Sequence, residues 1–257
     1  IIKLKINFII IILVIMCGIF ATINNNQESS SIEKEFKKTQ SRGPEFSILK
    51  TYSNITIGFH RLAINGLNEK SNQPFEIDNL VLICNGEIYN YRELAITNNI
   101  KLTTDSDCEI ILHLYKLYGL EYTLHLLDGV FAFIIYDKLK ATFIIARDPY
   151  GVRPLYYYTD SNQYGFASEL KSIYKFPHRK KLIQNFLPGN YMILSNLNSK
   201  ITCYLNKYHS LPYSNNLNQT FDNQLSREIF DNFSNAIKKR VISTTDRPIG
   251  CLLSGGL

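Results

Sequence analysis

The sequence predicts stacked β-sheets covered by helices. Many segments are short, rich in β-branched or aromatic residues and bounded by turn residues, which is typical of strands. Few segments show the apolar spacing of a helix. Some of the strand segments are nearly wholly apolar, so both of their faces can be buried. A chain of 257 residues can hold one large domain or two modest ones.

The strands are expected in short apolar segments, with residues 137–140 turning one strand back on the next. They are residues 55–64, 80–85, 130–137, 142–147 and 155–159. A helix is expected at 32–39, after a polar low-complexity loop. Another is expected where Ile110, Ile111, Leu114, Leu117 and Tyr118 share one face.

The last part of the chain changes character. It is rich in Asn and Ser from 204 to 223, and we place a linker at 206–221. A helix is expected from 222 to about 241, because Leu225, Ile229, Phe233 and Ile237 lie four residues apart. The apolar segment 249–253 then predicts a buried strand that opens a second domain.

Composition excludes several classes of protein. The chain is 45% hydrophobic and 19% charged, as globular proteins are. Its net charge is +6, but the lysines are scattered without a basic stripe, so we expect no nucleic-acid partner. The five cysteines include no CxxC pair, which predicts neither a disulfide framework nor a metal site. A reducing cytoplasm fits this cysteine content.

Residues 1–15 form an apolar leader. Their apolar run, 8–15, is shorter than the roughly 20 residues that cross a bilayer. Lys3 and Lys5 ahead of it resemble the start of a signal peptide, but no small-residue cleavage site follows. We expect this segment to be translated from sequence upstream of the true start and to be absent from the mature protein, without a membrane role. A signal or anchor is the alternative.

Cys17 follows Met16, so removal of an initiator methionine would make it the N-terminal residue. An N-terminal cysteine carries a nucleophilic thiol and, in its α-amino group, a base that can take the thiol proton. The unperturbed pKa of that amine, roughly 7.7–8.0, lies just below the roughly 8.5 of the thiol. With residues 1–15 attached, the nitrogen is an amide and this chemistry fails. Alternatively, Cys17 is an apolar residue at the end of a membrane span.

A series of motifs follows Cys17 in a fixed order. The motifs are 16–20 (MCGIF), 42–45 (RGPE), 60–64 (HRLAI), 85–90 (NGEIYN), 106–109 (SDCE), 127–133 (LDGVFAF), 147–156 (RDPYGVRPLY), 167–169 (ASE) and 252–257 (LLSGGL). The series resembles glutamine-hydrolysing asparagine synthetases, which join a class II glutamine amidotransferase domain to an ATP-pyrophosphatase domain. The resemblance covers residues 16–257.

The resemblance implies a fold and a division of the chain. The fold is the α+β, four-layer αββα sandwich of N-terminal-nucleophile hydrolases, followed by the truncated start of an α/β nucleotide-binding domain. The amidotransferase domain would occupy 16–205, and the synthetase domain would begin at 222–257. The expected assembly is either a single chain or a homodimer.

The residues that would carry glutamine hydrolysis have complementary chemistry. Cys17 is the nucleophile, and Asn85 with Gly86 supplies donors for the oxyanion, although an Asn-Gly pair is also typical of a tight turn. Arg61 suits the substrate carboxylate and Asp107 its ammonium, although Ser106 and Asp107 also stand where a helix N-cap would. The expected glutamine-binding residues are Arg61, Leu62, Ala63, Ile64, Asn65, Asn85, Gly86, Glu87 and Asp107.

The resemblance and the residue types also predict where Arg42 and the remaining cysteines lie. Arg42 would lie in a loop near the active site, where the usual pattern has a histidine before it and an aspartate at the position of Glu45. We assign no role to His60. The four cysteines other than Cys17 are expected to be small apolar core residues: Cys84, Cys108, Cys203 and Cys251.

A glycine-rich loop ends the chain and resembles the start of a pyrophosphate-binding loop. Its residues are Leu253, Ser254, Gly255 and Gly256. The aspartate and serine that follow in the family are absent, so we expect this chain alone to bind ATP poorly or not at all. The glutaminase domain would need no cofactor, whereas ATP and Mg would be co-substrates of the full synthetase.

The resemblance implies the glutaminase half of an asparagine synthetase. Glutamine would supply ammonia, which attacks aspartate that MgATP has activated. Three alternatives stay open: another class II amidotransferase, a relative that makes another amide, and a binding or membrane-anchored module in which residues 1–15 block Cys17.

Overall fold

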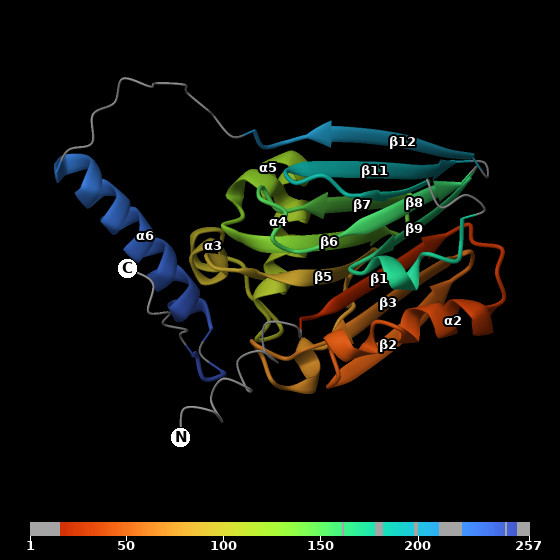
Figure 1. Ribbon diagram of the computed structural model, residues 1–257, viewed down its shortest axis with the longest axis horizontal. Coiled ribbons are helices and arrows are strands. Elements are labelled where there is room, and N and C mark those ends of the chain that lie inside the picture. The colour runs from red at the N-terminus through yellow and green to blue at the C-terminus, as the bar shows by residue number, and fades with distance from the viewer. Residues whose placement is uncertain are drawn as a thin grey trace.

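The described residues of this computed structural model form strands in antiparallel sheets, with helices outside them (Figure 1). The structure describes residues 16–160, 162–177, 182–197, 200–210, 223–244 and 246–250. The strands are β1 (Gly18–Ile23), β2 (Phe46–Tyr52), β3 (Ile55–Arg61), β4 (Phe75–Ile77), β5 (Leu80–Ile88), β6 (Gly129–Asp137), β7 (Thr142–Arg147), β8 (Tyr156–Asp160), β9 (Gln163–Ala167), β10 (Ile183–Asn185), β11 (Asn190–Leu197) and β12 (Lys200–Lys207). The helices are α2 (Ser29–Lys37), α3 (Tyr91–Thr97), α4 (Ile110–Tyr118), α5 (Leu120–Leu126) and α6 (Asn223–Ser243), with 3-10 turns η1 (Gln40–Arg42), η2 (Glu69–Ser71), η3 (Asp107–Glu109) and η4 (Leu170–Ser172).

Two sheets of six strands form the centre of the molecule. The first sheet has the order β10-β8-β9-β1-β3-β2, and the second has the order β12-β11-β7-β6-β5-β4. Because side chains alternate along a strand, β5 divides its residues between two cores. Val81 and Ile83 pack between the sheets, whereas Leu82 and Cys84 pack toward the helices.

Helices cover the outer face of each sheet. Phe36 of α2 packs with Phe20 of the first sheet, and Leu114 of α4 packs in the same cluster as Phe131 and Phe133 of the second sheet. The layers are therefore helix, sheet, sheet and helix. This confirms the predicted α+β sandwich.

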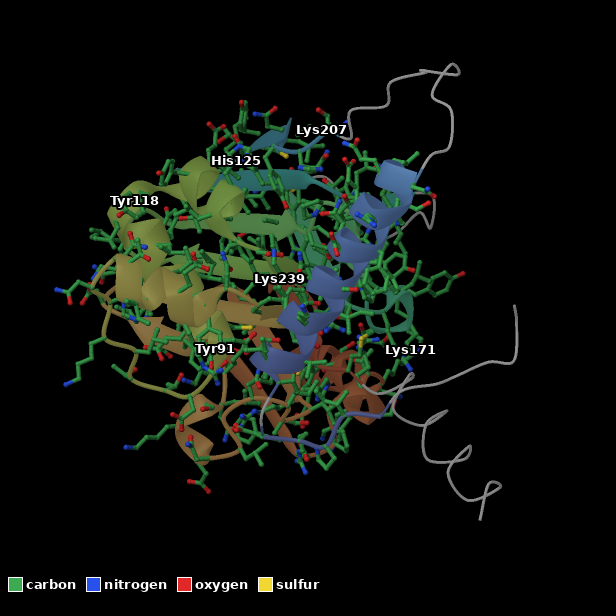
Figure 2. The ribbon with its side chains drawn as sticks, turned by 90° about the vertical axis from the view of Figure 1, so that its left-hand side faces the viewer. Tyr91, Tyr118, His125, Lys171, Lys207 and Lys239 are labelled. Atoms are coloured by element: carbon green, nitrogen blue, oxygen red, sulfur yellow. The ribbon has the colours of Figure 1, made fainter. Side chains whose placement is uncertain are left out.

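Helix α6 stands at one end of the sheets, and Figure 2 shows it crossing in front of them with Lys239 on its surface. Lys239 forms an ion pair with Asp128 at 2.5 Å, and the Arg240 guanidinium lies 5.0 Å from the centre of the Tyr89 ring. The apolar side chains of Ile229 and Phe233 are 54% and 67% exposed. The predicted helix is confirmed, but most of its apolar face is uncovered by the described residues.

Each of the segments expected to be a strand corresponds to a strand of the structure. Residues 55–64, 80–85, 130–137, 142–147 and 155–159 correspond to β3, β5, β6, β7 and β8. β1 was not predicted, although it lies in the middle of the first sheet and is buried along its whole length.

The linker predicted at 206–221 overlaps the end of β12, which continues to Lys207. This strand pairs with β11 along its whole length, but it is an edge strand, so most of its residues are exposed. Its Cys203 is exposed, which corrects the expectation of a core cysteine. Residues 211–222 lie outside the described part of the chain.

The strand expected at 249–253 is not formed where the structure can show it. Ile249 is 48% exposed and, like Gly250, has no strand conformation. Residues 251–257 lie outside the described part, including Cys251 and the glycine-rich loop of Leu253, Ser254, Gly255 and Gly256. Residues 1–15 lie outside it as well. No helix among the described residues has the length and apolar character needed to cross a membrane.

Candidate active site

Cys17 immediately precedes β1 and packs against the core between the sheets. Its Sγ donates to the Leu62 carbonyl oxygen and accepts from the Leu62 N–H, both at 3.3 Å. Arg42 Nε donates to the Cys17 carbonyl at 2.9 Å, and Arg42 Nη1 forms an ion pair with Glu169 at 3.1 Å. Leu62 thus holds the thiol of Cys17 and Arg42 holds its backbone, so Arg42 lies beside Cys17 as expected.

The thiol of Cys17 is a weak acid in this structure. Burial raises its pKa to about 11, while the Leu62 N–H and the charges of Arg153 and Arg61 act in the opposite direction. The thiol is therefore protonated near neutral pH. A nucleophilic role requires a base next to it.

A pocket opens beside Cys17 and collects most of the predicted glutamine-binding residues. Its lining includes Cys17, Arg61, Leu62, Ile64, Asn65, Gly86, Glu87 and Asp107. Two predicted residues, Ala63 and Asn85, are not in the lining. The N–H and carbonyl of Ala63 are bonded to Glu45 and Arg247. The pocket thus holds one cationic and two carboxylate side chains within reach of one thiol.

Asn85 lies in β5, with its side chain on the inter-sheet face that also carries Cys17. It follows Val81 and Ile83 in the alternating row that packs between the sheets. The side chain is 1% exposed, and its Nδ2 is a buried donor without a partner among the described residues. Since buried amide groups are nearly always hydrogen-bonded, this donor is available to an acceptor that the described residues do not supply.

Gly86 lies inside β5, which rules out the tight turn as the reason for the Asn-Gly pair. A Cβ at this position would lie 2.6 Å from the Val130 carbonyl oxygen and 2.8 Å from Phe131 Cβ. Glycine is therefore required by the close approach of β6. Its exposed backbone in the pocket is a consequence of the same packing.

Arg61 is more heavily bonded than its predicted role suggested. Nη1 donates to the Asn68 carbonyl at 3.1 Å and to Asn72 Oδ1 at 2.7 Å. Nη2 donates to the carbonyl oxygens of Asn65 and Gly66. The guanidinium thus fastens the loop 65–72 while it lines the pocket, so a carboxylate would meet a cation whose position is already fixed.

Asp107 is not the helix cap. Ser106 is the N-cap of η3, because its side chain accepts from the Cys108 N–H at 3.3 Å. Asp107 Oδ2 accepts from the Ile88 N–H at 2.6 Å, and Oδ1 accepts from Asn65 Nδ2 at 3.4 Å. Burial raises the pKa of Asp107 to about 6, with Glu87 contributing in the same direction. A bound cation would oppose this rise.

Sequence analysis missed Arg153, although it lies within the motif at 147–156. Its Nη2 forms an ion pair with Glu87 at 2.6 Å, and its Nε is a buried donor without a partner among the described residues. Asp148 fixes the preceding turn by accepting from the Tyr150, Val152 and Arg153 N–H groups at 2.9–3.1 Å.

A second pocket of about 340 Å³ lies beside the Glu87–Arg153 pair. Glu87 lines this pocket as well as the one beside Cys17, and the remaining lining includes Tyr89, Arg240 and Ile249. The Glu87–Arg153 ion pair therefore lies between Cys17 and the C-terminal end of α6.

The remaining motif residues have structural roles. His60 stacks on Phe36 with ring centres 3.9 Å apart, donates from Nε2 to the Phe36 carbonyl and contacts Ser47 Oγ through Nδ1. Cys84 and Cys108 are buried in the core between the second sheet and its helices, as expected.

The family of the chain follows from comparison with known proteins. Residues 16–228 match the family described as "Glutamine amidotransferase domain". The chain belongs to this family. The two sheets of the amidotransferase domain also resemble those of a glutamine phosphoribosylpyrophosphate amidotransferase from B. subtilis, with a TM-score of 0.59 and 22% identity, covering 75% of this chain and 49% of that one. At that identity the likeness shows the fold alone.

Curated relatives are named as glutamine-hydrolysing asparagine synthetases. The chain is 36% identical over 264 residues to the protein of Gallus gallus, covering 94% of this chain and 46% of that one. It is 36% identical over 268 residues to the protein of Homo sapiens. A probable asparagine synthetase of Dictyostelium discoideum is 37% identical over 258 residues. The amidotransferase chain spans about half the length of these relatives, 44–46%.

Proposed function

We propose that this amidotransferase domain hydrolyses glutamine at Cys17, as the glutaminase half of an asparagine synthetase. The observation that carries the proposal is the arrangement around the thiol. Cys17 faces a pocket with Arg61 and Asp107, and the amide donor of Asn85, without a partner among the described residues, lies on β5 of the facing sheet. A free amino acid needs a cation for its carboxylate, an anion for its ammonium and a nucleophile at its reacting end.

The reaction begins with proton transfer, because the thiol of Cys17 is protonated near neutral pH. The free α-amine of Cys17 takes the thiol proton, and the thiolate attacks the side-chain amide carbon of glutamine. The carbon–sulfur bond forms as the carbonyl becomes an oxyanion. Asn85 Nδ2 and the Gly86 N–H donate to that oxygen.

The intermediate then collapses. The carbon–nitrogen bond breaks, and the protonated α-amine of Cys17 returns its proton to the leaving nitrogen, which departs as ammonia. Water hydrolyses the thioester through a second oxyanion at the same donors, giving glutamate and the free thiol. No step requires a cofactor.

We assign the recognition of glutamine to the remaining pocket residues. Arg61 binds the substrate carboxylate, through Nε or by exchanging one of its loop contacts, and Asp107 binds the ammonium. The backbone of Leu62 to Asn65 and the side chain of Glu87 line the bound molecule. Released ammonia leaves past Glu87 and Arg153 into the second pocket.

In the complete protein, we propose that this ammonia attacks aspartate activated by MgATP as an adenylate, yielding asparagine, AMP and pyrophosphate. The similarity to asparagine synthetases supports this extension. A reducing cytoplasm suits a free catalytic thiol.

The free α-amine gives a direct test. Protein that begins at Cys17 should release glutamate from glutamine, whereas protein that retains residues 1–15 should not, since its Cys17 nitrogen is an amide. The measurement is glutamate release, with the N-terminal mass of both preparations determined. Equal rates in the two forms would contradict the mechanism and favour another base.

A further inference from the structure

The chain that follows α6 returns to the loop formed by residues 62–66. In Figure 2 this blue segment passes below the sheets, beside the orange part of the ribbon. Arg247 Nε donates to the Ala63 carbonyl at 3.0 Å, across 184 residues of sequence. Asp246 Oδ2 accepts from the Gly66 N–H at 2.8 Å. Two consecutive residues therefore contact the loop at points three residues apart.

Both backbone polar groups of Ala63 are held by one ion pair. Glu45 accepts from the Ala63 N–H through Oε2, and its Oε1 accepts from Arg247 Nη2 at 2.6 Å. Arg247 in turn bonds the Ala63 carbonyl. The family that the chain resembles usually has an aspartate at the position of Glu45. The longer side chain of Glu45 makes both contacts in this structure.

The opposite side of the same loop faces the catalytic thiol. Leu62 contacts Cys17 Sγ through both its N–H and its carbonyl, immediately before Ala63. Gly66 adopts a φ of +65°, and a Cβ there would lie 2.3 Å from Ser71 Oγ, so its conformation is tightly restricted. A displacement of Ala63 or Gly66 would therefore carry Leu62 and the pocket wall with it.

We propose that Arg247 and Asp246, together with Glu45, are positioning residues for glutamine binding. They hold the loop 62–66 in the geometry that its backbone needs beside Cys17. This inference rests on the proposed glutaminase function. On this proposal, the affinity for glutamine depends on the position of the chain after α6. A displacement of that chain would change the shape of the glutamine pocket.

The test compares Arg247→Met and Glu45→Gln in the full protein beginning at Cys17. Arg247→Met keeps the apolar stem but loses both hydrogen bonds. We expect it to raise KM for glutamine about three- to tenfold and to leave kcat within about twofold, because the contacts are half-exposed and do not touch the reacting atoms. Glu45→Gln should act in the same direction. In the double variant, KM should rise no further than in the stronger single variant, since both substitutions break the same Glu45–Arg247 ion pair.

Lys239→Met is the matched control. It breaks the Lys239–Asp128 ion pair, which also ties the α6 region to the sheets but does not contact the loop 62–66. Its KM should be unchanged. Arg247→Lys, which keeps the charge beside Glu45, provides a milder variant if Arg247→Met does not fold.

The outcomes separate this inference from the proposed function. An unmutated protein without glutamine hydrolysis would overturn the proposed function and this inference with it. If the unmutated protein is active, unchanged KM in Arg247→Met, Arg247→Lys and Glu45→Gln would overturn the inference alone. A lower melting temperature without a change in KM would show that the contacts only stabilise the fold.

Discussion

Cys17 immediately precedes β1, and Asn85 lies on β5 of the facing sheet, whereas the residues after Arg61 form a loop that side chains hold in place. β1 is bonded to β3 on one side and to β9 on the other, so the start of the strand is fixed by backbone pairing. β5 is paired with β6 along its whole length, including Asn85 with Ala132, and with β4 over Leu80–Leu82. The groups that we propose to react are thus held by strand pairing.

The loop side has no such support. Residues 62–66 are bonded by the side chains of Arg61 at the end of β3, Glu45 from an earlier loop and Arg247 from beyond α6. Side-chain contacts of this kind, partly exposed, are weaker and more easily changed than a ladder of backbone bonds. We therefore expect changes on the sheet side to appear in kcat and changes on the loop side to appear in KM.

The largest expected effect is on the sheet side. Cys17→Ala should abolish glutamine hydrolysis, because no other group replaces the nucleophile. The complete protein should still use ammonia, since the acceptor reaction needs only the amine. Cys203→Ala, which removes an exposed thiol on the edge strand, is the control and should be fully active. Loss of both activities in Cys17→Ala would mean that Cys17 serves the fold.

Asn85→Ala should come next. It removes a donor that acts where charge develops, so kcat should fall by about a hundred- to a thousandfold with a smaller change in KM. Steady-state glutaminase kinetics measure this, and a melting curve checks that the variant is folded. A rise in KM at constant kcat would place Asn85 in substrate binding and not in the oxyanion site.

The comparison also explains what the sequence could predict. β5, β6 and β7 are apolar and bounded by turn residues, so local pattern identified them. β1 is as deeply buried, but it runs directly into a polar low-complexity stretch, and no strand was predicted there. β12 alternates apolar residues at Ile201, Cys203 and Leu205, but it runs into the Asn- and Ser-rich stretch that favoured a linker.

The site divides in the same way. Cys17, Asn85 and Asp107 lie in motifs, so the resemblance to a family identifies them from the sequence alone. The Glu45–Arg247 pair joins residues 202 positions apart, and the Arg153–Glu87 pair joins residues 66 apart. Neither pair has a local pattern, so only the folded chain brings them together. The four hydrogen bonds that Arg61 donates to the loop 65–72 likewise could not be predicted from the sequence.

On the binding side, Asp107→Asn should raise KM for glutamine about ten- to a hundredfold. It removes the charged partner of the substrate ammonium, and losing such a bond costs about 1.5–3 kcal/mol. The substitution keeps an oxygen that can accept from the Ile88 N–H. A KM equal to that of the unmutated protein would exclude Asp107 from the ammonium site.

The smallest effect is a dependence on pH that the same residue imposes. The pKa of Asp107 is raised from 3.8 to about 6 in the folded protein, so below pH 6 the carboxyl is increasingly neutral and binds an ammonium poorly. KM for glutamine should rise about tenfold from pH 7 to pH 5, and this rise should be absent in Asp107→Asn.

The raised pKa of Asp107 also predicts how the stability of the folded protein depends on pH, which can be measured without substrate. Between pH 4 and 6 the folded state binds more protons than the unfolded state, so the contribution of Asp107 to stability decreases as pH rises through this range. At pH 7 the buried charge then costs on the order of 3 kcal/mol, and Asp107→Asn should melt at a higher temperature than the unmutated protein. At pH 4 the two should melt alike. A lower melting temperature for Asp107→Asn at pH 7 would show that the carboxylate stabilises its surroundings, and the electrostatic basis for assigning it to a cationic ligand would be lost.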